Sequence, residues 1–212
     1  MKKRRYSKRM LSALMVPVVA GTMMAGPAFA DVNVGEGETL TITGTANTER
    51  VIATGDSATV VLDADAELTV DGDYPAIGLF DNSTVTLGAG SSVTNTNTAY
   101  DAAGIMMIDY GYTEDATSTV TLDDAAITAS ATGDDVVAQG IMITAYPYTG
   151  GDSVISLDNG SAIAASATAT PAAYVAGYAT AYGINVDNGT AVTISLDNGS
   201  TVSATAGVAT TG

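Results

Sequence analysis

The stretch Ser118-Thr119-Val120-Thr121-Leu122 decides the fold, because the chain repeats it. Successive side chains of a β-strand point to opposite sides, so Val120 and Leu122 are expected to face a core while Thr119 and Thr121 face outward. The leucines of successive copies lie 25, 35, 35 and 39 residues apart. The other copies are residues 58–62, 83–87, 153–157 and 192–196.

Two further apolar segments follow each copy. A turn comes directly after the leucine, and Asp-Asn-Gly at 158–160 and 197–199 is typical of it, because Asn and Gly tolerate positive φ. A second apolar residue follows five or six positions after the leucine: Leu68, Val93, Ile127, Ile163 and Val202. A third apolar patch comes each time behind a glycine: Gly78, Gly104, Gly140 and Gly183.

A repeat of three short strands predicts an all-β solenoid, a parallel β-helix of about five to six coils. One coil cannot bury its own apolar face, so stacked copies must cover one another. Ladders of Leu over Leu and of Ile over Val are expected to form the core. Residues 39–43 are expected to begin a degenerate first coil. A β-sandwich of similar composition is the alternative, since regular strand spacing fits it too.

The first thirty residues have the pattern of a secretory signal peptide. A basic start with Lys2, Lys3, Arg4 and Arg5 precedes an apolar run, and the segment closes on Ala28-Phe29-Ala30. Small residues at these positions predict cleavage between Ala30 and Asp31. The apolar run is shorter than the roughly 20 residues that a bilayer requires. We therefore expect residues 31–212 to form the exported domain.

The charge is divided sharply along the chain. Six of the seven basic residues lie before residue 10, and only Arg50 lies after the predicted cut, where all 23 acidic residues are found. One cation against 23 carboxylates leaves the exported domain at −22. Such a surface repels phosphate backbones, so we expect no nucleic-acid partner. The chain has no cysteine, so disulfides cannot hold the fold.

The sequence lacks the residues that common catalytic sites use. Without His or Cys, the Ser-His and Cys-His pairs are impossible, and zinc loses its main ligands. We expect no enzymatic activity, no cofactor and no resident metal. Carboxylate pairs, as in glycosidases, are the only catalytic candidates. They are Asp123-Asp124 and Asp134-Asp135.

Calcium is an alternative use for the carboxylates, because hard cations bind clustered oxygen atoms. Neither an EF-hand loop nor the glycine-rich nonapeptide of calcium-binding β-helices occurs in the chain. The candidate ligands are Asp63, Asp65, Asp71, Asp73, Asp158 and Asp197.

Variable stretches between the strands contain most of the tyrosines. The stretches are residues 94–103, 109–117, 145–152 and 166–181, and insertions of this kind are expected to project as surface loops. Tyrosine is enriched at interfaces, so these loops are candidates for a contact surface. The alternative is that the rings cover the edges of the coils. The tyrosines are Tyr100, Tyr110, Tyr112, Tyr146, Tyr148, Tyr174, Tyr178 and Tyr182.

A long basic signal segment followed by these repeats resembles the passenger region of a Gram-negative autotransporter (type V secretion) adhesin. The repeats and the opening Gly37-Glu38-Thr39-Leu40-Thr41-Ile42-Thr43-Gly44 carry the resemblance, which extends over residues 31–212 in the style of the repeat. The family implies a right-handed β-helix that is threaded to the cell surface through a C-terminal barrel. No such barrel lies within these residues, and the chain is expected to be an N-terminal fragment.

The leading hypothesis is therefore a cell-surface or secreted, adhesin-like passenger of a Gram-negative bacterium. It would mediate adhesion or aggregation without enzymatic activity, by presenting its faces and loops to a glycan or protein of a host or another cell. A β-helix enzyme acting on polysaccharides is one alternative. A self-assembling matrix or biofilm component is the other, which the Thr-rich faces and an open last coil favour.

Overall fold

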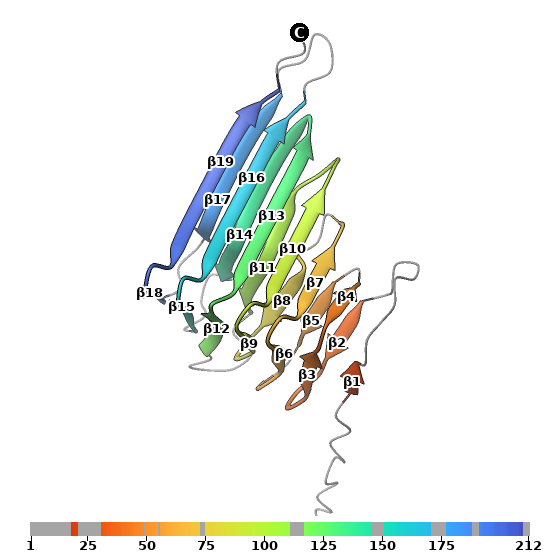
Figure 1. The fold of residues 1–212 in the computed structure, drawn as a ribbon, viewed down its shortest axis with the longest axis vertical. Coiled ribbons are helices and arrows are strands. Elements are labelled where there is room, and N and C mark those ends of the chain that lie inside the picture. The colour runs from red at the N-terminus through yellow and green to blue at the C-terminus, as the bar shows by residue number, and fades with distance from the viewer. Residues whose placement is uncertain are drawn as a thin grey trace, which may run out of the picture.

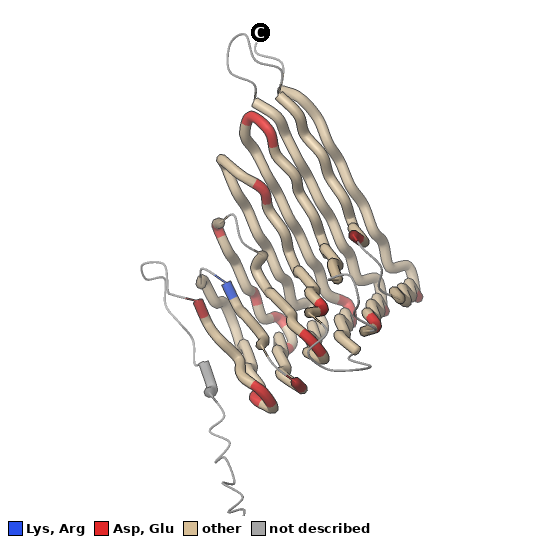
Figure 2. Tube along the Cα trace, turned by 180° about the vertical axis from the view of Figure 1, so that it is seen from behind, with Lys and Arg blue, Asp and Glu red and all other residues tan. Residues whose placement is uncertain are grey.

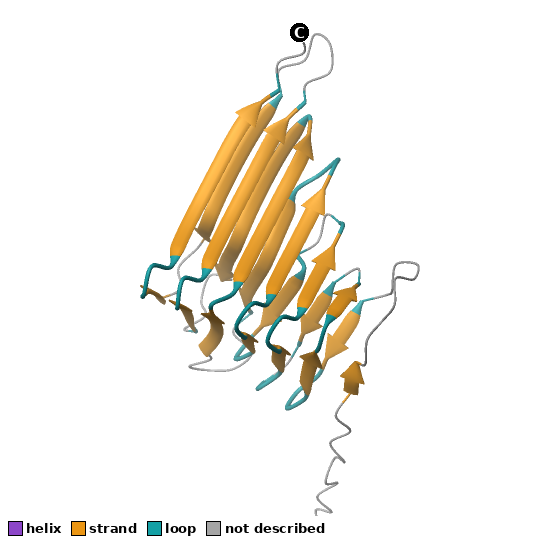
Figure 3. Cartoon of the chain, in the orientation of Figure 1, coloured by secondary structure: helices purple, strands orange, loops and turns teal. Residues whose placement is uncertain are grey.

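Strands dominate the chain throughout its described part. The computed structural model describes residues 18–20, 31–48, 50–54, 56–72, 75–110, 117–145, 151–170, 177–187 and 191–209. Within these ranges every regular element is a β-strand (Figure 3). The strands form three parallel sheets, which we name sheets A, B and C.

Each sheet takes every third strand of the chain. Sheet A contains β1 (Val18–Ala20), β3 (Thr39–Ile42), β6 (Thr59–Leu62), β9 (Thr84–Leu87), β12 (Thr117–Asp123), β15 (Asp152–Asp158) and β18 (Ala191–Leu196). Sheet B contains β2 (Val32–Val34), β5 (Val51–Ala53), β8 (Ile77–Phe80), β11 (Ala102–Asp109), β14 (Asp135–Ala145) and β17 (Tyr178–Asp187). Sheet C contains β4 (Thr45–Asn47), β7 (Glu67–Val70), β10 (Ser92–Asn97), β13 (Ala126–Gly133), β16 (Ala162–Ala169) and β19 (Thr201–Val208).

The chain visits sheets B, A and C in turn, which makes six stacked coils from β2-β3-β4 to β17-β18-β19. Strands of sheet C run upward on the near side of Figure 1, those of sheet B run downward behind them, and the coils advance to the upper left. This winding is right-handed, the hand that parallel crossover connections almost always adopt. The predicted parallel β-helix is confirmed, with six coils among the described residues.

The predicted core ladders are also confirmed. Leu122 pairs in register with Leu87 on one side and with Leu157 on the other. Val120 and Leu122 are fully buried, while Thr119 and Thr121 are half-buried on the outer side. The second ladder lies in sheet C, where Ile127 pairs with Val93 and with Ile163. Alternation of apolar and hydroxyl residues therefore determines which side of each strand faces the core.

One predicted alignment is wrong. The sequence places Gly78 in line with Gly104, but Gly78 pairs with Met106, and Ile77 pairs with Ile105. The position beside Gly104 belongs to Ala76, whose amide donates to the carbonyl of Ala103. Gly78 instead faces outward, beneath the ring of Phe80. The alignment failed because Gly78 and Gly104 both precede an apolar patch, although Gly78 faces outward from β8 and Gly104 faces the core from β11.

Turns between sheets A and C require positive φ at equivalent positions. Asn159 and Gly160 have φ of 54° and 84°, and Asn198 and Gly199 have φ of 50° and 84°, as the Asn-Gly pattern predicts. The amide of Asn159 also donates to the carboxylate of Asp123 in the previous coil at 2.6 Å. Each turn is therefore tied to the turn below it.

The coils widen from the N-terminal to the C-terminal end. In sheet B the strands lengthen from three residues in β5 to eleven in β14. The added length brings sheets B and C directly against each other above the triangular core of Leu, Ile and Val side chains. The side chains between them are small. They are Ala102, Ala129, Ala131, Val136, Ala138, Ala165 and Ala167.

A column of glycines marks the boundary between the two parts of the core. In β14 the buried side changes at Gly140. Before this position every second residue is buried, up to Ala138 and Gly140, and after it burial continues from the adjacent residue with Ile141 and Ile143. A Cβ on Gly140 would collide with Ile163 of sheet C and would lie 2.5 Å from the carbonyl oxygen of Gly183. Glycine is therefore required here by close approach of the backbones.

The predicted signal peptide lies outside the described residues, except for residues 18–20. These form β1, which pairs in parallel with β3. Ala30, on one side of the predicted cleavage site, is outside the described residues, whereas Asp31 begins the first coil. Among the residues that the structure describes, no helix has the length and apolar composition needed to cross a membrane.

Candidate binding surface

The outer face of sheet C is a regular array of hydroxyl groups. Outward residues of β10, β13, β16 and β19 align in register across the coils. One column runs Thr96, Ser130, Ser166 and Thr205, and these four residues are half-buried or exposed. We call the outward residues of these strands the hydroxyl face. They are Ser92, Thr94, Thr96, Ala126, Thr128, Ser130, Thr132, Ala162, Ala164, Ser166, Thr168, Thr201, Ser203, Thr205 and Gly207.

The spacing of this array follows from the backbone. Strands of a sheet lie about 4.8 Å apart, and every second residue of a strand is roughly 6.7 Å away. The outward residues therefore sit on a rectangular grid that the pairing of the coils holds rigid, and eleven of the fifteen carry a hydroxyl, the others being Ala126, Ala162, Ala164 and Gly207. No residue of the hydroxyl face carries a charge.

Acidic residues are concentrated at the ends of the strands. Seen from behind in Figure 2, the Asp and Glu positions lie mostly at the lower edge and at the upper strand ends, while the strand bodies have few of them. Many of these residues lie at the C-terminal ends of the sheet A strands or in the turns that follow them, including Asp63, Asp123, Asp158 and Asp197. The strong negative charge thus frames the sheets without covering the hydroxyl face.

Sheet A presents a narrower hydroxyl array. Thr84 pairs with Thr59 and Thr119, and Thr86 pairs with Thr121. The pattern weakens in β15, where Val154 takes the place next to Thr119. The strands of sheet A are also shorter than β13 and β16, so the hydroxyl face of sheet C is the broader of the two neutral surfaces.

The outer face of sheet B carries aromatic residues at two places. Phe80 and Tyr110 stack face to face, with ring centroids 5.5 Å apart and planes inclined by 2°. Tyr178 and Tyr182 project outward from β17, with 69% and 42% of their surface exposed. Beside them the amide of Asn185 donates to Gln139 at 2.8 Å.

The prediction that the tyrosines lie in loops is wrong for Tyr178 and Tyr182, which belong to a strand. Tyr100 is exposed in the short connection between β10 and β11, so for this residue the loop placement is confirmed. Tyr110 directly follows β11 and stacks on Phe80, which fits the alternative in which rings cover the coil. The remaining predicted tyrosines, Tyr112, Tyr146, Tyr148 and Tyr174, lie outside the described residues.

The two candidate carboxylate pairs lie at opposite ends of one strand. Asp123-Asp124 precedes β13, and Asp134-Asp135 follows it. Eight residues of extended chain separate them by roughly 26 Å. A glycosidase needs its two carboxyls within about 5–10 Å. The two pairs therefore cannot act together on one bond. Within the pairs, Asp123 accepts a hydrogen bond from the side-chain amide of Asn159 at 2.6 Å and Asp135 accepts one from the backbone amide of Tyr178 at 3.0 Å.

Many carboxylates instead accept hydrogen bonds from the backbone of the next coil. These N–H groups come near strand starts or in connections, and a carboxylate that accepts from them ties one coil to the next and stabilises the stack. The pairs are Asp81 with the amide of Tyr110 at 2.8 Å, Asp101 with Val137 at 2.8 Å, Asp109 with Gly151 at 3.0 Å, and Asp135 with Tyr178 at 3.0 Å.

The predicted calcium ligands are not brought together. Asp63 and Asp65 share one turn, Asp158 and Asp197 lie in later turns of the stack, and Asp73 is outside the described residues. Among the residues that the structure describes, no group of three or more His, Cys, Asp or Glu side chains is arranged to hold a metal ion.

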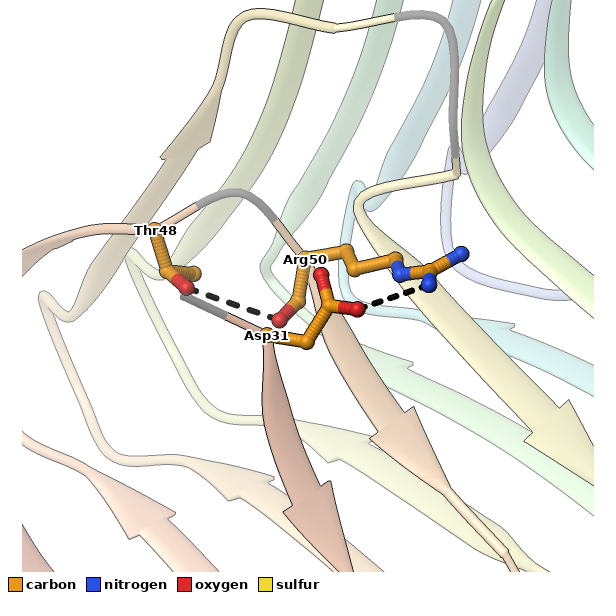
Figure 4. A network of polar contacts seen from close by, with 3 residues as sticks. All are labelled: Asp31, Thr48 and Arg50. Carbon is orange, nitrogen blue, oxygen red and sulfur yellow. Dashed lines mark hydrogen bonds and ion pairs between the residues drawn. The ribbon is translucent and has the colours of Figure 1, made fainter. Parts of the chain in front are cut away.

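Arg50 forms an ion pair at the beginning of the first coil. Its guanidinium donates to the carboxylate of Asp31 at 2.6 Å, and both side chains are about 30% exposed (Figure 4). The backbone carbonyl of Arg50 accepts from the amide of Val32 and from the hydroxyl of Thr48. The one arginine beyond the predicted signal peptide thus binds the residue that the predicted cleavage would leave first.

No protein-family model, curated protein or solved structure matches this chain.

Proposed function

We propose that the chain is an exported, non-enzymatic binding protein, an adhesin-like β-helix passenger of a Gram-negative bacterium. The observation that carries this proposal is the hydroxyl face, a rigid and neutral grid on a domain that otherwise bears a large negative charge. Rigid faces bind without the entropy cost of ordering a loop. The partner is a neutral glycan or a protein surface on a host or bacterial cell.

Two observations favour binding over catalysis. In each carboxylate pair that sequence reasoning offers to an enzyme, one member already accepts a hydrogen bond from the next coil, Asp123 from the side chain of Asn159 and Asp135 from the backbone of Tyr178. The carboxylates at the coil junctions accept backbone hydrogen bonds, which is a structural use. The proposed function therefore needs neither a cofactor nor a metal, and it excludes nucleic acid on the ground of charge.

Adhesion is tested by coating beads with the purified chain and measuring their attachment to cells and to a panel of neutral glycans. Ser130→Glu and Ser166→Glu place charges in the middle of the hydroxyl face, where they are half-buried or exposed and leave the core intact. We expect both variants to lose attachment. Thr86→Glu and Thr121→Glu, on the outer face of sheet A, are the matched controls and should attach like the wild type.

Attachment that survives both substitutions on sheet C would contradict this assignment of the surface. Export is tested separately, by fractionating a Gram-negative host that expresses the chain and sequencing the N-terminus of the product. Cleavage that begins the product at Asp31 supports export, and an uncleaved cytoplasmic product contradicts it.

A further inference from the structure

The outer face of sheet B differs from the hydroxyl arrays of sheets A and C, because its middle column is apolar. The column runs through Ile52, Gly78, Met106 and Met142, which follow one another in register across four coils and lie on the outward side of their strands. Met106 and Met142 are therefore side by side on neighbouring strands, with backbones about 4.8 Å apart. Both side chains are half-buried, so part of each is open to solvent.

Met107, the residue directly after Met106, has the opposite environment. It belongs to the core with 1% of its surface exposed, and its in-register neighbours Leu79 and Ile143 are buried as well. These are the only three methionines after the predicted signal peptide, and the chain has no Cys, His or Trp. The thioethers are therefore the main targets for mild oxidants in the exported domain. The fold places two of them on the surface and one in the core.

We propose that Met106 and Met142 form a site of reversible oxidation on the outer face of sheet B, with a peroxide as the oxidant. The proposal is independent of the hydroxyl face and of the proposed function. The sulfur of each thioether attacks one oxygen of the peroxide and the O–O bond breaks. The other oxygen takes the proton of the first and leaves as water or an alcohol. The sulfur is oxidised by two electrons to a sulfoxide, and the peroxide is reduced by the same two electrons.

The reverse step also depends on the outward position of the pair. A methionine sulfoxide reductase supplies two thiols, which become a disulfide while the sulfoxide oxygen leaves as water. Such an enzyme can reach an outward side chain in the folded chain, whereas Met107 is enclosed. Oxidation of Met107 would also bury a polar sulfoxide in an apolar core, which is costly without a hydrogen-bond partner. The fold therefore permits the cycle at the pair and opposes it at Met107.

The neighbours of the pair differ on its two sides. Gly78, beside Met106, is covered by the ring of Phe80, since a Cβ on this glycine would lie 3.3 Å from Cε2 of the ring. Asn185, beside Met142, donates one N–H of its side-chain amide to the neighbouring strand at 2.8 Å. A sulfoxide oxygen on Met142 can accept from the second N–H of this amide. Each sulfoxide makes an apolar side chain polar, so oxidation interrupts the apolar column and leaves the core intact.

The test is the rate at which each methionine of the purified, folded chain gains oxygen in hydrogen peroxide. Mass spectrometry of the peptides measures it, with fragmentation to separate Met106 from Met107. Met106 and Met142 should react at least about tenfold faster than Met107, the ratio that a local opening free energy of about 1.4 kcal/mol produces. In urea that unfolds the chain, the three rates should become equal. Sulfoxide reductases for both epimers, with a thiol, should return the folded chain to its original mass.

Leucine variants provide the controls, because leucine replaces methionine with little change in volume. The double variant Met106→Leu with Met142→Leu should gain no oxygen beyond the predicted signal peptide at a peroxide dose that fully oxidises the pair. Met107→Leu is the matched control and should be oxidised like the wild type. Unchanged β-sheet circular dichroism after oxidation of the pair is expected. Equal rates for Met106 and Met107 in the folded chain, protection of both outward methionines, or loss of the β-sheet signal on their oxidation would each overturn the proposal.

Discussion

Replacing Gly140 by alanine tests the closest approach between the sheets of the solenoid. The added Cβ would lie 2.5 Å from the carbonyl oxygen of Gly183 and would overlap the side chain of Ile163. A backbone oxygen in a paired strand cannot move away as a flexible side chain can. Strand β17 within sheet B and Ile163 of sheet C must therefore both shift, and overpacking of this kind costs about 1–3 kcal/mol.

Gly207→Ala is the matched control for this substitution. Gly207 also lies within a strand, no atom is found within 4 Å of the position that its Cβ would occupy, and its φ is not positive. Alanine should be neutral there or should stabilise by about 0.4–1 kcal/mol, because it restricts the unfolded chain. The same chemical change is thus predicted to have opposite signs at the two sites.

The assay is equilibrium unfolding in urea, followed both by circular dichroism and by tyrosine fluorescence. Two probes are needed because a stacked solenoid need not unfold in one step. We expect Gly140→Ala to unfold at lower urea than the wild type, and Gly207→Ala at equal or higher urea. If Gly140→Ala is as stable as Gly207→Ala, the close packing at the glycine column, within sheet B and against Ile163 of sheet C, is refuted.

Three further predictions follow from single contacts. Leu122→Ala should destabilise the fold by about 2–5 kcal/mol, because it opens a cavity in the leucine ladder. Thr121→Ala, on the opposite face of the strand, is the control and should change stability by less than about 0.5 kcal/mol. Thermal unfolding measures both. Arg50→Met should lower the free energy of unfolding by at most about 1 kcal/mol, because its ion pair with Asp31 is partly exposed. Urea unfolding at low and high salt should show a smaller difference at high salt. A large difference that does not change with salt would argue against an electrostatic role. Adding millimolar calcium should leave the thermal midpoint unchanged, and an upward shift would reveal a site that the described carboxylates do not form.

The core ladders could be predicted from sequence because their chemistry alternates strongly. In residues 118–122 large apolar residues and hydroxyl residues exchange at every step, so the buried side is unambiguous. The turns were predictable for a similar reason, since Asn159-Gly160 and Asn198-Gly199 tolerate a backbone that other residues avoid.

The lengthening of the strands was not predicted because alanine gives little contrast. Residues 128–132 and 165–169 alternate alanine with threonine or serine, and their buried alanines pack sheets B and C together. That period of two is the signal that could have identified them as strands. The same omission assigned Tyr178 and Tyr182 to a loop, although they stand on the outer side of β17.

The hydroxyl face was only partly foreseen. The sequence predicts that threonines face outward, but it does not predict which threonines align between coils, because the spacing between repeats varies from 25 to 39 residues. The register of the strands aligns them. The uses of Asp101 and Asp109 as acceptors for the backbone of the next coil were missed for the same reason, since their partners are 36 and 42 residues away.

The stacking of the coils is tested most directly by distances between spin labels on the outer face of sheet A. Cysteines introduced in pairs as Thr41→Cys with Ser156→Cys, and as Thr41→Cys with Ser195→Cys, label the chain without competition from native cysteine. These pairs are four and five coils apart, so the backbone separations are about 19 Å and 24 Å at roughly 4.8 Å per coil. Measured in an excess of unlabelled chain, the two distances should differ by one coil spacing. Equal distances, or a second distance shorter than the first, would contradict the parallel β-helix.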